Sequence, residues 1–209
     1  HLLRSIIKDE KLEAKAVYGF FKAQSHGEEV ELFEDQTSFY FPRQLMDKGS
    51  QPNFSLADYI SPTGDDHIGL FAVTAVHGIE NIIKEYQVKN DDYSEIMAKV
   101  LADRLAEAAA EWLHKKVRTE YWGYSKDEDL DLNAMLYEKY CGIRPAPGYP
   151  ACPDHKEKDK IWKLLNVEEQ IGINLTESRA MFPAASVCGW YFSHPKARYF
   201  SVLKNEVLQ

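Results

Sequence analysis

The sequence predicts an α+β fold in which an antiparallel or mixed sheet is flanked by helices. Three observations support this class. Segments rich in β-formers lie between residues 17 and 41, a nearly continuous apolar run covers residues 67–76, and a helical pattern of about 28 residues begins near residue 92. Strand and helix patterns do not alternate strictly along the chain, which argues against a doubly wound parallel sheet.

Length and composition predict a single domain over residues 1–209. Of the 209 residues, 44% are hydrophobic, which is enough for a sizeable core and excludes global disorder. The formal net charge of −8 argues against nucleic acid or an anionic membrane as the main partner. We see neither a signal peptide nor an apolar run of membrane-spanning length. The three cysteines are irregularly spaced and do not form a disulfide framework, so we expect a reducing, cytoplasmic location.

The first third of the chain predicts a helix followed by three strands. The opening helical pattern should end near residues 11–13, and because it begins without an N-cap we expect a piece of a longer protein. Val17–Ala23 and Val30–Phe33 flank the turn sequence SHGE and predict a β-hairpin. The segment SFYFPRQ predicts a third strand, which Pro42 ends or places at a sheet edge.

The middle of the chain predicts one buried strand and two helices. His67–Val76 is apolar and of strand length, which predicts a strand buried on both faces. A helix should follow over Ile79–Tyr86, and a long helix near residues 92–119 should open with a capping box of Asp92 and Glu95. The side chains that fall on one stripe of the long helix, and that we expect to face the core, are Met97, Leu101, Leu105, Ala108 and Trp112.

The last third predicts two helices, an intervening loop and two strands. A short helix is expected over Asn133–Tyr140, and a second within residues 154–172, ended by Gly172. The tail predicts two strands around the turn sequence SHPKA. The aromatic residues of these strands can fill the sheet core or present rings to a pocket; they are Trp190, Tyr191, Phe192, Tyr199 and Phe200.

The loop between those helices, RPAPGYP at residues 144–150, is a candidate binding site. Its three prolines fix φ, so the loop loses little entropy when a ligand docks. Gly148 permits a close backbone approach or a positive φ, Arg144 offers a planar fork to a carboxylate, and Tyr149 offers a flat face with a hydroxyl. The residues alone leave two interpretations open: a small-molecule cradle, or a rigid connection whose arginine pairs with a nearby acid.

Other candidate side chains carry weaker signals. Glu107 lies beside the apolar stripe of the long helix, where it can face a cationic ligand or pair with Arg104 on the helix surface. Cys141, Cys152 and His155 are too few and too scattered for a zinc site, so we predict no metal. The chain has no Walker loop, Gly-x-Ser-x-Gly or His-Glu-x-x-His motif, and it contains no Gly-x-Gly, which disfavours a Rossmann-type nucleotide site.

Several segments, in consistent order, resemble the S-adenosylmethionine-binding activation domain of cobalamin-dependent methionine synthase. They are LADRLAEAAAEWLH (101–114), GIRPAPGYPACPDHKEK (142–158), LTES (175–178) and SVCGWYFSHPKARYF (186–200). DDYSEIMAKVLADRLAE and ADYISP resemble it too, so the match runs through nearly the whole chain. The loop RPAPGYP followed by YFSHP is highly specific for this family. The resemblance implies a bent antiparallel sheet with helices.

The resemblance also implies a function in methionine biosynthesis. In that family the domain is the C-terminal module of 5-methyltetrahydrofolate–homocysteine methyltransferase. It presents S-adenosylmethionine for the reductive methylation of cob(II)alamin, which reactivates the enzyme. The implied partners are the cobalamin-binding domain of the same enzyme and flavodoxin or a similar reductase. The isolated domain is not expected to be a complete catalyst, and no catalytic residue is implied because the sulfonium methyl group is already activated.

The ligand contacts that the resemblance implies lie on the long helix, in the loop and in the tail. They are Glu107, Arg144, Ala146, Gly148, Tyr149, Tyr199 and Phe200. Arg144 resembles the arginine that binds the methionine carboxylate, and the other loop positions contact the ligand largely through their backbone. Phe200 stands where the family often has a second tyrosine, so packing is retained while a hydroxyl is lost. Lys115, Lys116 and Arg118 are either a basic contact for flavodoxin or a solvated helix face.

Two departures from the family and two alternatives complete the expectations. The family's Asp-Trp-x-x-Phe-Phe segment, whose aspartate also binds the ligand, and its final helix have no counterpart here, so we expect a fragment truncated at both ends. One alternative is a stand-alone S-adenosylmethionine-binding or scaffold protein without an attached corrinoid enzyme. The other is an independent methyltransferase, which the missing glycine-rich loop disfavours. An Asp-x-His-x-x-Gly segment upstream would favour the attached module.

Overall fold

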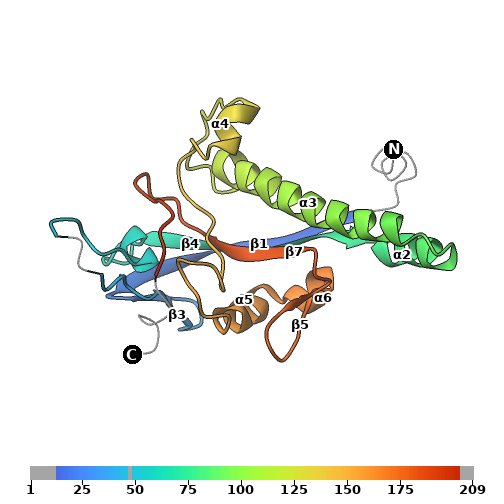
Figure 1. Cartoon of the computed structure of the whole chain (residues 1–209). Coiled ribbons are helices and arrows are strands. Elements are labelled where there is room, and N and C mark those ends of the chain that lie inside the picture. Colours follow the sequence, from blue (N-terminus) through green and yellow to red (C-terminus); the bar gives the residue numbers. More distant parts are fainter. Residues whose placement is uncertain (1–12, 47–48, 203–209) are drawn as a thin grey trace.

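A computed structural model describes residues 13–46 and 49–202 and shows one curled antiparallel sheet with helices on both faces (Figure 1). The sheet consists of β1 (Glu13–His26), β2 (Glu29–Leu32), β3 (Ser38–Tyr40), β4 (Asp66–His77) and β7 (Ser186–Tyr191), in the order β3-β2-β1-β4-β7. Every neighbouring pair in it is antiparallel, which confirms the predicted α+β class. The predicted opening helix lies outside the described residues.

The predicted hairpin and its edge strand are both present. Gly27, with φ of +65°, lies in the tight turn between β1 and β2. β3 pairs with β2 at the sheet edge and ends before Pro42, as the sequence predicted. β1 is longer than the predicted Val17–Ala23 and pairs with β4 along most of its length, so these two strands form the centre of the sheet.

β4 is buried on both faces, as its continuous apolar run predicted. Ile68 and Leu70 point into one hydrophobic cluster, and Phe71 and Val73, which alternate with them, point into a second. The first cluster lies on the side of α5 (Glu157–Leu165) and α6 (Val167–Ile171), and the second faces α3 (Asp92–Lys116). Figure 1 shows the sheet running between α3 and this short helix pair.

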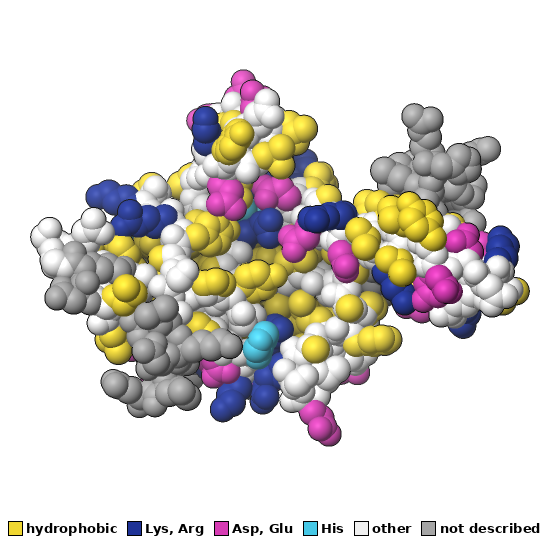
Figure 2. Space-filling view, in the orientation of Figure 1, with side chains coloured by type: hydrophobic (Ala, Val, Ile, Leu, Met, Phe, Trp, Pro, Cys, Tyr) yellow, Lys and Arg dark blue, Asp and Glu magenta, His cyan; other side chains and the backbone are white. Residues whose placement is uncertain are grey.

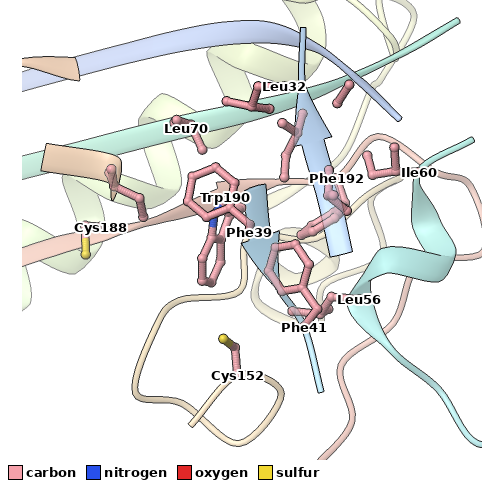
Figure 3. Close-up of a cluster of buried hydrophobic side chains, with 14 of the residues drawn as sticks. Leu32, Phe39, Phe41, Leu56, Ile60, Leu70, Cys152, Cys188, Trp190 and Phe192 are labelled. Carbon is pink, nitrogen blue, oxygen red and sulfur yellow. The ribbon is translucent and has the colours of Figure 1, made fainter. Parts of the chain in front are cut away.

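An aromatic cluster forms the centre of the larger core (Figure 3). The Trp190 ring contacts Phe41 and Phe39 edge-on, with centroid distances of 4.9 and 5.7 Å. Phe192, two residues after Trp190, also contacts Phe41, with a centroid distance of 5.6 Å. Trp190 and Phe192 lie on either side of Tyr191, the last residue of β7. The cluster therefore fixes the position of this strand end, to which the candidate loop is hydrogen-bonded.

The long helix starts one residue earlier than the capping box predicted. The N-cap is Asp91, whose side chain accepts a hydrogen bond from the Ser94 backbone N–H at 3.0 Å. Glu95 does not close a box with Asp92 but pairs with Lys99 one turn later. After α3 the helical backbone continues as a π-helical turn, η2 (Val117–Tyr121).

The predicted core stripe of α3 is wrong by one position. The residues that face the protein are four alanines at spacing i, i+4, which are Ala98, Ala102, Ala106 and Ala110, and then Leu113 three residues later. Met97 and Trp112, predicted to be buried, are 41% and 57% exposed, and Ala108 is exposed too. Small side chains let the helix approach its neighbours closely, so the alanine face packs inward while Met97 and Trp112 lie outward.

The remaining helices differ from prediction in length. The short helix α4 (Leu132–Leu136) ends before the predicted Tyr140, and α2 (Ile79–Val88) matches its prediction. The single helix predicted before Gly172 is divided into α5 and α6 by Asn166, which has φ of 50°. Gly172 ends α6 in the left-handed conformation, as predicted. A one-turn helix, η1 (Leu56–Tyr59), completes the helical elements of the described residues.

The second strand predicted for the tail is absent from the described residues. The turn at SHPKA is present, with a hydrogen bond from Ala197 N to His194 O of 2.9 Å, but residues 197–202 form no strand. Val202 N instead donates to Pro150 O at 2.7 Å, which holds this segment against the candidate loop rather than against the sheet. A separate small hairpin contains β5 (Asn174–Leu175) and β6 (Met181–Phe182). Among the described helices, none is long and apolar enough to cross a membrane.

The alanine face of α3 makes a direct test of the packing. Ala102 is buried against Ile79 and Ile82 of α2, so Ala102→Leu should overpack this interface and lower the free energy of unfolding by about 1–3 kcal/mol. Ala108→Leu, on the exposed side of the same helix, should change it by less than about 0.5 kcal/mol. Urea denaturation measures both values, and an equal loss in the two variants would contradict the orientation of α3.

Candidate functional site

The RPAPGYP loop is attached to the end of β7 through backbone hydrogen bonds. Trp190 N donates to Pro145 O at 3.0 Å, and Ile143 and Phe192 exchange two further bonds of 3.0 Å. This approach requires Gly189, because a Cβ there would lie 2.3 Å from Pro145 O. Sequence reasoning missed Gly189, although a glycine inside the apolar strand VCGWY was a signal of close backbone approach.

Inside the loop, Gly148 has the positive φ that the sequence allowed. Its φ is +90°, and its N–H donates to Cys152 O at 2.8 Å, closing a tight turn. The imidazole of His155 lies directly beneath this glycine, since a Cβ at Gly148 would meet His155 Cε1 at 2.1 Å. Both the positive φ and the close contact with His155 therefore require glycine at this position, and the imidazole of His155 packs against the loop backbone.

Cys152 and His155, whose spacing resembles that of metal ligands, make other contacts. The Cys152 thiol points into the core and donates weakly to Tyr40 O at 3.8 Å, and burial raises its pKa. Nδ1 of His155 lies 3.2 Å from Nζ of the buried Lys158. Burial, and then the Lys158 charge, lower the pKa of His155. Within residues 13–46 and 49–202, no group of three His, Cys, Asp or Glu side chains is arranged to hold a metal ion.

A cavity of about 400 Å³ opens between the loop, α3, the α4 segment and the tail. It is lined by six of the seven predicted contacts, which are Glu107, Arg144, Ala146, Tyr149, Tyr199 and Phe200. Gly148 does not line the cavity but sets the loop conformation. Glu138 also lines it, and sequence reasoning missed this residue because its place in the cavity depends on how the chain folds back after α4.

Arg144 is the central charge of this cavity. Its Nη2 donates to Glu111 Oε2 at 3.2 Å, while its Nη1 lies 3.9 Å from Glu107 Oε2. Its Nε is buried and has no hydrogen-bond partner among the described residues. Burial has the largest single effect and would lower the pKa of Arg144, but Glu111, Tyr199 and Tyr140 together outweigh it, so the pKa is raised. The guanidinium is thus charged, mostly buried, and still has an unused donor.

Glu111 belongs to a polar stripe along α3 and the following turn η2 that the sequence analysis did not identify. Glu107, Glu111, His114 and Arg118 follow one another at spacings of four, three and four residues, so they share one face of the helix. Sequence reasoning considered Glu107 beside the apolar stripe and as a partner of Arg104, but it did not connect Glu107 with the later members of the stripe, which stand at helical spacing from it. Figure 2 shows acidic and basic side chains close together near the centre of the molecular face that it draws.

The predicted basic cluster is wrong for Arg118. This residue is fully buried and forms two hydrogen bonds to Glu128, Nε–Oε2 at 2.7 Å and Nη2–Oε1 at 2.8 Å. Its guanidinium also lies 3.9 Å from the centre of the Tyr140 ring. Lys116 pairs with Glu120, so Lys115, Lys116 and Arg118 do not form an exposed basic patch. The π-helical turn at Val117–Tyr121 contains Arg118.

His114 is buried between the two arginines. Its ring stacks on Tyr191 with a centroid distance of 5.1 Å, and its Nε2 lies 3.3 Å from Tyr124 Oη. Burial lowers the pKa of His114 well below its usual value, and the charges of Arg118 and then Arg144 add to the effect. The imidazole is therefore neutral and adds no positive charge to the stripe.

The aromatic residues of the tail have two separate roles. Trp190, Tyr191 and Phe192 are buried in the core, which confirms the core interpretation for these three. Tyr199 and Phe200 line the cavity, and Tyr199 Oη accepts a hydrogen bond of 3.1 Å from the Arg144 backbone N–H. This bond joins the tail to the loop, so the two walls of the cavity are connected at Arg144.

The arrangement suits a small zwitterion with an additional positive charge. The Arg144 guanidinium can bind a carboxylate, while Glu107 and Glu138, which line the same cavity, favour cationic groups. Pro145, Pro150 and the aromatic rings provide flat apolar surface, which fits a ring system. The cavity is thus equipped for binding and orientation.

Two comparisons with known proteins bear on this site. A family model described as "Vitamin B12 dependent methionine synthase, activation domain" matches residues 1–208. A crystal structure of the MetH reactivation domain bound to AdoHcy matches with a TM-score of 0.91 and 44% sequence identity. That match covers 96% of this chain and 64% of the other, so this chain spans less than two thirds of the solved one.

The close approach at Gly189 predicts a specific loss of stability. Gly189→Ala places a methyl group against the Pro145 carbonyl, and we expect the free energy of unfolding to fall by about 1–3 kcal/mol as the loop is pushed from β7. Gly19→Ala is the matched control in β1, because its methyl group would meet only side-chain atoms of Phe21 and Leu165. Urea denaturation compares them, and a larger loss in Gly19→Ala would contradict this account of the loop.

The buried neutral His114 predicts a pH dependence of stability. Since its folded pKa is lowered, the unfolded chain binds a proton that the folded chain does not, so stability falls as the pH drops through about 6.5. His114→Gln should remove part of this fall between about pH 7.5 and about pH 5.5, and part should remain because His155 is lowered too. Urea denaturation at both pH values measures the difference; an unchanged pH dependence in His114→Gln would exclude this role.

Proposed function

This chain belongs to the family of activation domains of vitamin B12 dependent methionine synthases, and on that premise we propose that it binds S-adenosylmethionine in the Arg144 cavity. One observation carries the proposal. Arg144 lines a cavity of about 400 Å³, and the carboxylates of Glu111 and Glu107 lie 3.2 and 3.9 Å from its guanidinium nitrogens. A cavity of roughly 300–1,000 Å³ is typical of sites for ligands of this size.

The charges of the cavity match those of S-adenosylmethionine group by group. Arg144 would bind the ligand carboxylate through its planar fork. Glu107 and Glu138 would favour the ammonium and sulfonium groups, which together give the ligand a net positive charge. Tyr149 and Phe200, with the prolines of the loop, would contact the adenosine portion through apolar and aromatic surface.

The solved relative supports this ligand class. That structure is of a reactivation domain bound to AdoHcy, the product that remains when S-adenosylmethionine has given up its methyl group. The two molecules share the adenosine and the amino-acid portions and differ in the methyl group and the charge on sulfur. A site that binds one of them therefore has the polar contacts that the shared adenosine and amino-acid portions of the other need.

The finer proposal is that the bound ligand serves the reductive methylation of cob(II)alamin held by a neighbouring domain of the same enzyme. In this scheme one electron from flavodoxin or a similar reductase would make the cobalt nucleophilic enough to take the methyl group from the sulfonium, and AdoHcy would be left behind. The residues of this chain move no proton in this scheme. They bind and orient the sulfonium, and positioning of this kind lowers the barrier of a group transfer by several kcal/mol.

The wider context is proposed on the same basis. We place the chain in 5-methyltetrahydrofolate–homocysteine methyltransferase, in the cytoplasm, as a module that works with a cobalamin-binding domain. The chain spans 64% of the solved reactivation-domain chain, so ligand contacts made by the rest of that chain have no counterpart among the described residues. Ligand binding by this chain is the part of the proposal that its own residues can test directly.

Arg144→Ala tests the proposed binding site. We expect the dissociation constant for S-adenosylmethionine to rise at least about tenfold, since a charge-assisted pair contributes roughly 1.5–3 kcal/mol. Isothermal titration calorimetry with the wild-type chain and the variant measures it. Arg144→Lys, which keeps the charge but not the planar fork, should give a smaller loss.

The matched control is Arg179→Ala, which removes a surface arginine that pairs with Asp159 outside the cavity. It should leave the dissociation constant unchanged. Thermal unfolding of all variants checks that they are folded under the conditions of the titration. Equal affinity of the wild type and a folded Arg144→Ala variant would rule out this cavity as the site.

A further inference from the structure

We propose that Glu111 is a positioning residue that keeps Arg144 against the wall of the cavity and away from Glu107. In this position the guanidinium stays open to the ligand carboxylate, and Glu107 stays open to the cationic groups. The inference rests on the proposed function, because its ligand is the S-adenosylmethionine proposed there. It assigns a role to a residue behind the cavity, which does not line it.

Arg144 lies between two competing carboxylates on the same helix. Glu111 Oε2 is 3.2 Å from Nη2, whereas Glu107 Oε2, one helical turn earlier, is 3.9 Å from Nη1. The Glu111 side chain is 26% exposed and that of Glu107 is 51% exposed, so the Glu111 pair is less screened by solvent. The better-buried carboxylate therefore holds the guanidinium, and the solvated one stays free of a close pair.

Glu111 is itself held from behind by a fixed positive charge. Arg118 Nη1 lies 4.0 Å from Glu111 Oε1, and both atoms are buried without a hydrogen-bond partner in the described part of the chain. Arg118 cannot move toward the cavity easily, because Glu128 binds it through two hydrogen bonds and Tyr140 covers its face. The charges thus alternate from Arg144 through Glu111 and Arg118 to Glu128, two of each sign.

This geometry predicts what happens when Glu111 loses its charge. Arg144 would then have Glu107 as its nearest carboxylate, at the mouth of the cavity. A close pair between these two residues would occupy both of the charged groups that the ligand needs. The loss of Glu111 should therefore weaken the binding of a ligand that carries a carboxylate.

The opposite sign is expected if Glu111 merely competes with the ligand. In that case removing its charge would free Arg144 and tighten binding. A role in folding alone would weaken the binding of every ligand in the cavity to the same extent. The three cases are therefore separated by the direction of the change and by its dependence on the ligand carboxylate.

The experiment is calorimetry of Glu111→Gln with two ligands. S-adenosylmethionine has the carboxylate, and 5′-methylthioadenosine keeps the adenosine and the sulfur but lacks the amino-acid portion. We expect the dissociation constant for S-adenosylmethionine to rise about tenfold and that for 5′-methylthioadenosine to change less than about twofold. Glu120→Gln, which removes a glutamate that pairs with Lys116 on the surface, is the control and should change neither value.

A double variant tests the competition directly. In a Glu107→Gln background the nearby alternative partner of Arg144 is gone, so adding Glu111→Gln should raise the dissociation constant for S-adenosylmethionine less than about threefold. Glu111→Asp keeps the negative charge and should lose less affinity than Glu111→Gln. It also provides a second variant if Glu111→Gln does not fold, which thermal unfolding checks.

The outcomes separate this inference from the proposed function. Unchanged or tighter binding of S-adenosylmethionine by folded Glu111→Gln would overturn the positioning role and leave the binding site in place. Equal weakening of both ligands would overturn it as well, in favour of a purely structural role. If the wild-type chain binds no S-adenosylmethionine, the proposed function and this inference fall together.

Discussion

The hydrogen bond from Trp190 N to Pro145 O connects the hydrophobic core to the candidate site. The Trp190 ring packs among Phe39 and Phe41, while its backbone N–H binds the loop that carries Arg144. Trp190 therefore fixes the cavity wall relative to the hydrophobic core. The contact exists because Gly189 leaves room for the Pro145 carbonyl, so the site depends on the absence of a single methyl group.

Helix α3 supplies both the packing and the charges of the site. Its alanine face lets the helix lie close to the sheet and to α2. This closeness removes water from the adjacent polar stripe, where Arg118 and His114 are fully buried. Each charge in this dry environment needs a partner of opposite sign, because burying an unpaired charge costs several kcal/mol of stability. The ionic chain behind the cavity is thus a consequence of the small side chains on the neighbouring face.

Local patterns predicted the β1–β2 hairpin, the edge strand, the buried strand β4 and the glycine at Gly148, because each of these depends on nearby residues. The same reasoning failed where partners come from distant segments. Arg118 was placed on the surface because Glu128 and Tyr140 reach it only through the turn after η2. The core stripe was assigned to large side chains, whereas close packing selected alanines. The contacts carried over from the resemblance, apart from Gly148, line one cavity, but Glu111 and Glu138 required the folded chain.

The unequal exposure of the two carboxylates around Arg144 has a consequence for its response to ionic strength. Dissolved ions screen exposed charges more than buried ones, so added salt weakens the attraction of Glu107 more than that of Glu111. The balance between the two carboxylates therefore shifts further toward Glu111 as salt increases. The internal arrangement of the cavity is in this way protected from changes in the electrolyte around it, even though its mouth is open to solvent.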